Sequence, residues 1–185
     1  SGSMAAILGL DDAKIIEICS IANKLGVVEA VNFNSPGQVV IAGEKQAVAN
    51  VCELMKKAGA KRALVLPVSV PSHCSLMKDA AMDFKHSVDN INFQMGSEKV
   101  LHNVDADYSS NIEQIKSKLV EQLYKPVLWT SIVQEMKNLG VEKLIEAGPG
   151  KVLAGLTRRI DKSLTGSAII DVTTLKSTIE EISNA

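Results

Sequence analysis

The stretch from Pro67 to Met77 holds the residues that best fit a chemical role. Two prolines, Pro67 and Pro71, stiffen the chain before His73, and an apolar helical pattern begins directly after it. A histidine at a loop-to-helix junction can be held in one orientation with its ring facing a cleft, as a general base must be. The residues alone leave an equal alternative, in which neighbouring backbone simply satisfies the ring.

The other reactive side chains form no convincing site. His86 and His102 are isolated in the sequence, and no helical or strand spacing brings them to His73 as metal ligands. Cys74 adjoins His73, but adjacent residues seldom aim their side chains at one another, so we expect a small buried thiol. The turn 148–151, Gly-Pro-Gly-Lys, could hold a phosphate on backbone amides, yet it lacks P-loop spacing, and a strand-to-helix turn explains it equally well.

Composition argues against several classes of protein. The chain has 185 residues, of which 46% are hydrophobic and 22% charged, close to the averages for soluble globular proteins. The formal net charge of -1 argues against binding to nucleic acid or to an anionic membrane surface. No apolar run approaches the roughly 18 residues of a membrane span, and the first residues lack the pattern of a secretory signal. The three cysteines lack metal-type spacing and favour a reducing, cytoplasmic setting.

The first third of the chain follows the order of a split βαβ unit. We expect strands at 4–10, 27–33, 38–42 and 62–68. A helix with Asp11 or Asp12 as its N-cap separates the first two strands, and a second helix separates the last two. That second helix places on one face Val48, Val51, Cys52 and Met55. The turn 34–37, Asn-Ser-Pro-Gly, predicts a hairpin. The order β-α-β-β-α-β is ferredoxin-like, and we assign residues 4–66 to one small subdomain.

Beyond His73 the pattern changes to helices that alternate with short strands. Apolar repeats predict helices at 77–88, 112–123 and 129–136, another that runs from the glycine turn to about residue 160, and a last one at 173–183. Strands are expected at 100–104, 141–146 and 168–172. We therefore assign residues 67–185 to a second α/β region with at most three strands. Three short strands make an incomplete sheet, so this region is expected to lack part of its core.

Four stretches together resemble the malonyl-CoA:acyl carrier protein transacylases of bacterial fatty acid synthesis. They are residues 32–43 (NFNSPGQVVIAG), 67–77 (PVSVPSHCSLM), 120–124 (VEQLY) and 146–153 (EAGPGKVL). The resemblance covers nearly the whole chain in order, and it is weakest at 82–100 and near the C-terminus. It implies an α/β fold, made of the ferredoxin-like subdomain and the C-terminal part of an α/β-hydrolase-like acyltransferase domain.

The resemblance also implies a reaction. In that family a malonyl group passes from malonyl-CoA to an enzyme serine, and then to the phosphopantetheine thiol of acyl carrier protein. On this comparison His73 is the general base, and Gln122 is the residue whose main-chain carbonyl orients the histidine ring. Asn32 and Asn34 would lie at the rim of the substrate cleft, although turn chemistry also explains them, strongly so for Asn34. No metal or organic cofactor is implied, because acyl transfer needs only a nucleophile, a base and oxyanion donors.

Three features of that family do not occur in this sequence. They are the Gly-x-Ser-x-Gly elbow with the nucleophile, a Gly-Gln-Gly-type loop, and an arginine that pairs with the malonyl carboxylate. We therefore interpret the chain as a C-terminal fragment and expect no transacylase activity from it alone. The incomplete large domain is expected to associate with the missing N-terminal half or with itself.

The alternative interpretation is a non-catalytic ferredoxin-like domain that binds a ligand or regulates another protein. Such a domain needs no nucleophile, but it leaves unexplained the stretch 67–77 around His73, called here the histidine loop. An RNA-recognition module of the same topology is a poorer match, because such modules stack bases on strand aromatics and only 3% of this chain is aromatic.

Overall fold

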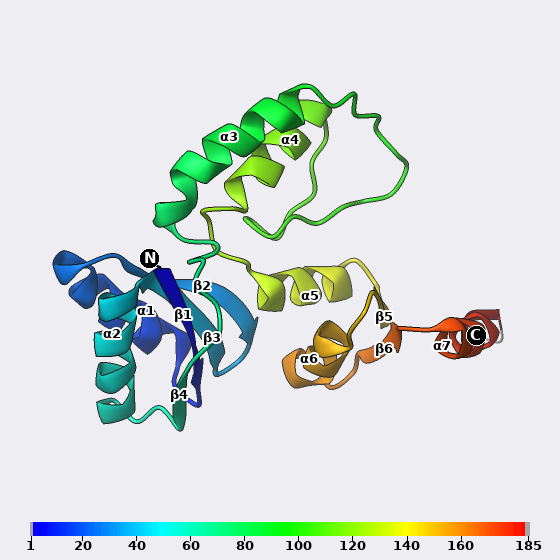
Figure 1. The fold of residues 1–185 in the computed structure, drawn as a ribbon. Coiled ribbons are helices and arrows are strands. Elements are labelled where there is room, and N and C mark those ends of the chain that lie inside the picture. The colour runs from blue at the N-terminus through cyan, green and yellow to red at the C-terminus, as the bar shows by residue number, and fades with distance from the viewer. Residues whose placement is uncertain (1, 184–185) are drawn as a thin grey trace. The chain divides into compact units, whose positions relative to one another are not determined.

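The computed structural model describes residues 2–183, and Figure 1 shows their fold. The chain forms two compact units, Ser1–Ile132 and Val133–Ala185. The elements in order are β1 (Gly2–Leu8), α1 (Asp12–Ala22), η1 (Asn23–Leu25), β2 (Val28–Ser35), β3 (Gln38–Glu44), α2 (Lys45–Lys57), β4 (Arg62–Val65), η2 (Ser75–Met77), α3 (Lys78–Asp89), α4 (Ile112–Glu121), α5 (Trp129–Asn138), β5 (Lys143–Ala147), α6 (Val152–Ile160), β6 (Thr165–Ile169) and α7 (Val172–Ser183).

The boundary between these two units lies after Ile132, whereas the predicted domain boundary lies after residue 66. The predicted division concerned the domains of the longer family enzyme, and it stays a prediction. Within the described residues, no helix combines the length and the apolar character that crossing a membrane requires.

The first four strands form one antiparallel sheet in the order β2-β3-β1-β4. With α1 and α2 between them, this is the predicted ferredoxin-like arrangement, which is confirmed. The hairpin between β2 and β3 turns through Pro36 and Gly37. Gly37 has a φ of +71°, in the left-handed region that favours glycine. Only Arg62–Val65 of the predicted fourth strand joins the sheet.

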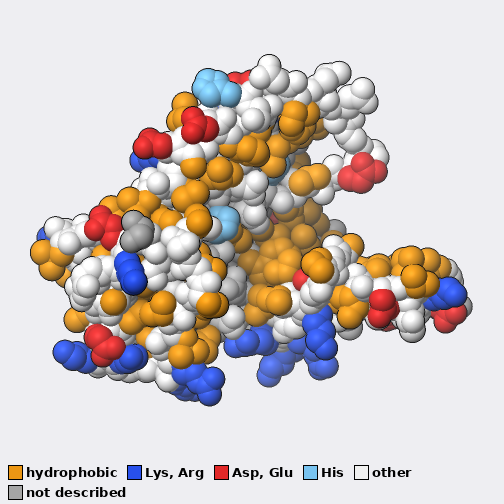
Figure 2. Space-filling model, viewed as in Figure 1, with side chains coloured by type: hydrophobic (Ala, Val, Ile, Leu, Met, Phe, Trp, Pro, Cys, Tyr) orange, Lys and Arg blue, Asp and Glu red, His pale blue; other side chains and the backbone are white. Residues whose placement is uncertain are grey.

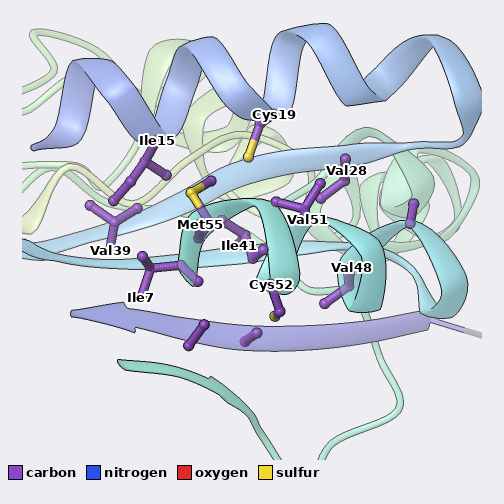
Figure 3. Close-up of a cluster of buried hydrophobic side chains, with 13 residues drawn as sticks. Ile7, Ile15, Cys19, Val28, Val39, Ile41, Val48, Val51, Cys52 and Met55 are labelled. Atoms are coloured by element: carbon purple, nitrogen blue, oxygen red, sulfur yellow. The ribbon is translucent and has the colours of Figure 1, made fainter. Parts of the chain in front are cut away.

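Helices α1 and α2 cover one face of the sheet (Figure 1). Their apolar side chains and alternate residues of the strands make the main buried cluster, drawn in Figure 3. All four residues predicted on one face of α2 are buried, as expected. At the start of α1 the Asp11 carboxylate accepts a hydrogen bond from the Ala13 N–H at 2.9 Å, which confirms the predicted N-cap.

The histidine loop packs on the opposite face of the sheet. Cys74 is fully buried there, in a cluster with Met4, Val31, Val40 and Ala42. Upstream in the same segment, Ser69 accepts a hydrogen bond from the Gly2 N–H at 3.2 Å. A Cβ atom on Gly2 would lie 2.3 Å from Cδ of Pro71, so only glycine permits this approach. The ferredoxin-like sheet therefore carries the histidine loop on the face opposite α1 and α2.

Helices α3 and α4 pack through a smaller buried cluster of Ala81, Val88 and Val120. The prediction of a strand at 100–104, between these helices, is wrong. Only an isolated bridge between Leu101 and Tyr108 forms there. The His102 main chain instead closes a local turn, since its N–H donates to Asp107 and its carbonyl accepts from Ala106. Both main-chain groups of His102 are therefore used within the turn and not in a sheet.

The second unit contains a parallel pair of strands, β5 and β6, with α6 and α7 in contact with β6. Strand β6 lies three residues earlier than the predicted 168–172. Large apolar side chains stay exposed on α7, and Figure 2 shows hydrophobic side chains over the surface where Figure 1 places this helix. They are Val172, Leu175, Ile179 and Ile182. A two-stranded sheet is smaller than the sheet of a complete α/β domain, in line with the incomplete sheet that the sequence predicted.

Candidate active site

The ring of His73 is half-buried and fixed by a short contact. Its Nδ1 lies 2.6 Å from the main-chain oxygen of Gln122. A carbonyl oxygen can only accept a hydrogen bond, so Nδ1 carries the proton and Nε2 of the neutral ring has the free lone pair. The contact therefore leaves Nε2 able to take a proton, which is what a general base does.

The main chain of His73 is strained. Its φ of +65° lies in the left-handed region, which costs a non-glycine residue about 1–2 kcal/mol. Its N–H donates to the carbonyl of Leu123 at 3.0 Å, next to the carbonyl that holds the ring. Strain of this kind persists only where surrounding contacts fix the conformation, and it often accompanies function.

Gln122 is the C-cap of α4, and this position explains its contact with the histidine ring. The last carbonyls of a helix have no partner within the helix, so that of Gln122 is free to accept from the histidine. The C-terminal end of a helix also carries a partial negative charge, which favours the positive ring that forms when a base takes a proton. The sequence alone placed Gln122 only through the family resemblance.

Asn103 holds the side chain of Gln122 in place. Its Nδ2 donates to Oε1 of Gln122 at 3.1 Å. The main-chain oxygen of Asn103 also accepts from the N–H of Leu128 at 2.9 Å, which ties the two neighbouring loops together. No sequence pattern pointed to Asn103, because it lies 19 residues from Gln122 in a segment that folds as a turn.

Asn32 lies on β2, where this strand meets the loop after Gln122. It forms an isolated parallel bridge with Val127. The Phe33 N–H donates to the Val127 carbonyl, and the Val127 N–H donates to the Val31 carbonyl. Asn34 is also within β2, since the turn itself is made by Pro36 and the following glycine. In the part of the chain that the structure describes, no hydrogen bond joins either asparagine to His73, so their roles stay predictions.

The remaining candidates have structural explanations. His86 is exposed on α3, and His102 is 8% exposed, with burial lowering the pKa of its ring. Burial likewise raises the pKa of the Cys74 thiol, as expected for an inert cysteine. At the start of α6 the Glu146 carboxylate accepts from the Ala154 N–H at 2.8 Å, so a protein group already occupies that helix end. Among residues 2–183, no cluster of three or more histidine, cysteine or acidic side chains could hold a metal ion.

Comparison with known proteins gives one consistent result. No family model matches the chain. The malonyl CoA-acyl carrier protein transacylase of Escherichia coli K12 is 52% identical over 180 residues, and that of Haemophilus influenzae is 52% identical over 172 residues. The match to the Escherichia coli protein covers 97% of this chain but 58% of the relative, so the chain spans little more than half of its length.

Solved structures agree with the sequence matches. A malonyl-transacylase in complex with a type II polyketide synthase acyl carrier protein has a TM-score of 0.95 and 46% identity, over 98% of this chain and 59% of that one. An acyl carrier protein S-malonyltransferase from Vibrio cholerae has a TM-score of 0.93 and 52% identity, over 96% of this chain and 58% of that one.

These matches do not favour the alternative of a non-catalytic ligand-binding or regulatory domain. They agree with the resemblance that the four sequence stretches gave, and with the α/β fold that it implied. By sequence and fold, the chain belongs with the malonyl-CoA:acyl carrier protein transacylases, of which it matches the C-terminal part.

Proposed function

We propose that this chain supplies the histidine side of an acyltransferase site. The longer enzyme to which it corresponds would transfer a malonyl group from malonyl-CoA to the phosphopantetheine thiol of acyl carrier protein, through an acyl-serine intermediate. The 2.6 Å contact between Nδ1 of His73 and the main-chain oxygen of Gln122 carries the proposal, because it leaves Nε2 as the proton acceptor. His73 would take the serine proton when the acyl-serine forms, and the thiol proton when the acyl group moves on.

Gln122 would replace the acid of a Ser-His-Asp triad. Its carbonyl fixes the ring orientation and faces the charge that develops on the ring, which are the two tasks of the triad acid. Asn32 and Asn34 would bind the substrate at the rim of the small subdomain. Their half-buried positions on β2 leave each side chain partly accessible, as this role requires.

The proposed partners are malonyl-CoA and acyl carrier protein, with no nucleic acid and no membrane. A complex of a similar malonyl-transacylase with a type II polyketide synthase acyl carrier protein supports the second partner. A cytoplasmic location stays part of the proposal, in keeping with three free, buried cysteines, Cys19, Cys52 and Cys74. No cofactor is proposed, because a serine nucleophile, His73 as base and oxyanion donors are enough for acyl transfer.

The chain alone is expected to be inactive, since its sequence contains no Gly-x-Ser-x-Gly elbow. Incubation with malonyl-CoA, followed by intact-mass measurement, should return the unmodified mass. A malonyl adduct on the chain would contradict this expectation and would reveal a nucleophile of its own.

A chimera tests the proposal directly. The segment of the Escherichia coli transacylase that this chain matches is replaced by the chain, and transfer of malonyl to acyl carrier protein is measured. We expect an active chimera in which His73→Ala lowers kcat by about three orders of magnitude or more. His86→Ala is the matched control, because His86 is exposed on α3, and it should leave kcat unchanged. A folded, active chimera that tolerates His73→Ala would overturn the proposal.

A further inference from the structure

We propose that Glu29 is a positioning residue for His73. Glu29 lies on β2, and both of its carboxylate oxygens bind Ser75, two residues after the histidine. Oε2 accepts from the Ser75 N–H at 2.9 Å, and Oε1 accepts from the Ser75 hydroxyl at 2.6 Å. The inference rests on the proposed function only in taking His73 as the base, because the contact exists whatever the reaction.

The carboxylate of Glu29 replaces a missing helix cap. Ser75 opens the short helix η2, and the first N–H groups of a helix have no partner within it. The N-cap residue, Cys74, makes no side-chain capping bond, since its thiol is buried in the apolar cluster. Glu29 supplies the acceptor from a different element, and its charge makes these bonds about twice as strong as neutral ones.

Glu29 acts together with its neighbour on the same face of the sheet. A register irregularity of β2 lies between Ala30 and Asn32, and the contacts show that both Glu29 and Val31 reach the chain after His73. Val31 packs in the buried cluster that holds Cys74, while Glu29 binds the next residue, Ser75. One strand therefore fixes two consecutive residues directly after His73.

These contacts explain how His73 keeps its strained main chain. The main-chain oxygens of Gln122 and Leu123 hold the histidine itself. Glu29 holds the chain that leaves it. A left-handed conformation persists only while its surroundings fix it on both sides. Loss of the Glu29 contacts would let the chain relax to an ordinary φ and carry the ring away from the Gln122 carbonyl.

The test measures the tautomer of His73 by nitrogen NMR of the chain labelled at its histidine rings, at about pH 8, where an imidazole is neutral. The wild-type ring should carry its proton on Nδ1. In Glu29→Ala the proton should move largely to Nε2, as in free histidine, and the Ser75 amide should exchange with solvent at least tenfold faster. Glu29→Gln keeps one acceptor oxygen and should restore most of the wild-type signature.

Three controls separate positioning from general loss of stability. Glu53→Ala removes an equivalent side chain from an exposed site on α2, and it should leave the His73 tautomer unchanged. Val48→Ala weakens the core on the other face of the sheet without touching the loop, and it too should leave the tautomer unchanged. His86 gives an internal reference signal in every sample.

A folded Glu29→Ala chain with the wild-type His73 tautomer would overturn the proposal. If that variant does not fold, Ser75→Ala decides, because it removes only the hydroxyl bond to Glu29. Ser75→Ala should produce the same change to a smaller extent, and an unchanged ring would overturn the proposal there as well.

The outcome is independent of the proposed function, because the NMR signal involves no malonyl transfer. An inactive chimera combined with the expected His73 shift would reject the reaction alone. In an active chimera, Glu29→Ala should lower kcat by about 10- to 100-fold with little change in KM, since a displaced base slows the chemical step rather than binding.

Discussion

The two compact units of this chain differ in how well their apolar residues are covered. The ferredoxin-like sheet has a buried cluster on each face, one under α1 and α2 and one under the histidine loop. The unit Val133–Ala185 has a parallel pair of strands, and its helix α7 exposes a stripe of four large apolar side chains. The sheet that carries His73 is therefore rigid because both faces are packed. The second unit buries fewer apolar side chains for its size, and it is expected to gain stability when a partner surface covers the exposed ones.

The largest contrast is expected from one substitution made in both units. Ile7 is fully buried in β1, whereas Ile179 on α7 is 54% exposed. Ile7→Ala should lower the free energy of unfolding by about 2–5 kcal/mol, because it removes buried surface and leaves a cavity. Ile179→Ala should change it by less than about 0.5 kcal/mol. Urea denaturation of both variants measures this, and equal losses would contradict the contrast.

The exposed stripe on α7 should drive association of the chain. Ile179 and Ile182 lie on it, and both side chains are more than half exposed. Sedimentation velocity is expected to show self-association, and an environment-sensitive dye should fluoresce on binding. The double substitution Ile179→Ser with Ile182→Ser should weaken both signals. A wild-type chain that is monomeric and does not bind the dye would contradict the expectation.

Two glycine substitutions give a smaller contrast. Gly37 has a φ of +71°, so Gly37→Ala forces alanine into the left-handed region at a cost of about 1–2 kcal/mol. Gly150, before α6, lies outside the left-handed region, and an added Cβ there would meet nothing within 4 Å. Gly150→Ala should be within about 0.5 kcal/mol of wild type. Thermal unfolding of the two variants makes the comparison, and a neutral Gly37→Ala would contradict it.

The smallest effect is expected at a partly exposed carboxyl in the second unit. Hydrogen bonds from Lys137 and Ser163 lower the pKa of Asp161 to about 2. Because the folded pKa lies below the unfolded value of about 3.9, its stabilising contribution is complete above that value and is lost as pH falls toward 2. NMR titration should find the midpoint near 2.

Asp161→Asn should remove this part of the acid dependence of unfolding. The contrasting carboxyl is Asp12, whose pKa burial raises. Its charged form is disfavoured in the folded state, so its contribution to stability becomes more favourable as pH falls, and Asp12→Asn should remove this gain. An Asp161 midpoint at or above the ordinary value would reject the assigned hydrogen bonds.

The local pattern of residues was enough to predict most of the elements. Short apolar runs between turn residues located the strands, and the repeat from Val48 to Met55 located the buried face of α2. Asp11 and Gly37 marked a helix start and a turn. The strand expected at 100–104 failed because the main chain of His102 bonds to Ala106 and Asp107 and closes a local turn instead. Periodicity cannot reveal where backbone hydrogen bonds go.

The sequence by itself determined the order of the ferredoxin-like unit, and it singled out His73 and, through resemblance, Gln122 as candidate site residues. Only the tertiary structure decided what holds the histidine: the free carbonyl at the end of α4, Asn103 behind it, and the Glu29 carboxylate on Ser75. Glu29 and Ser75 lie 46 residues apart, and His73 and Gln122 lie 49 apart. Contacts at such separations follow from how the sheet and helices pack, and no local pattern of residues encodes them.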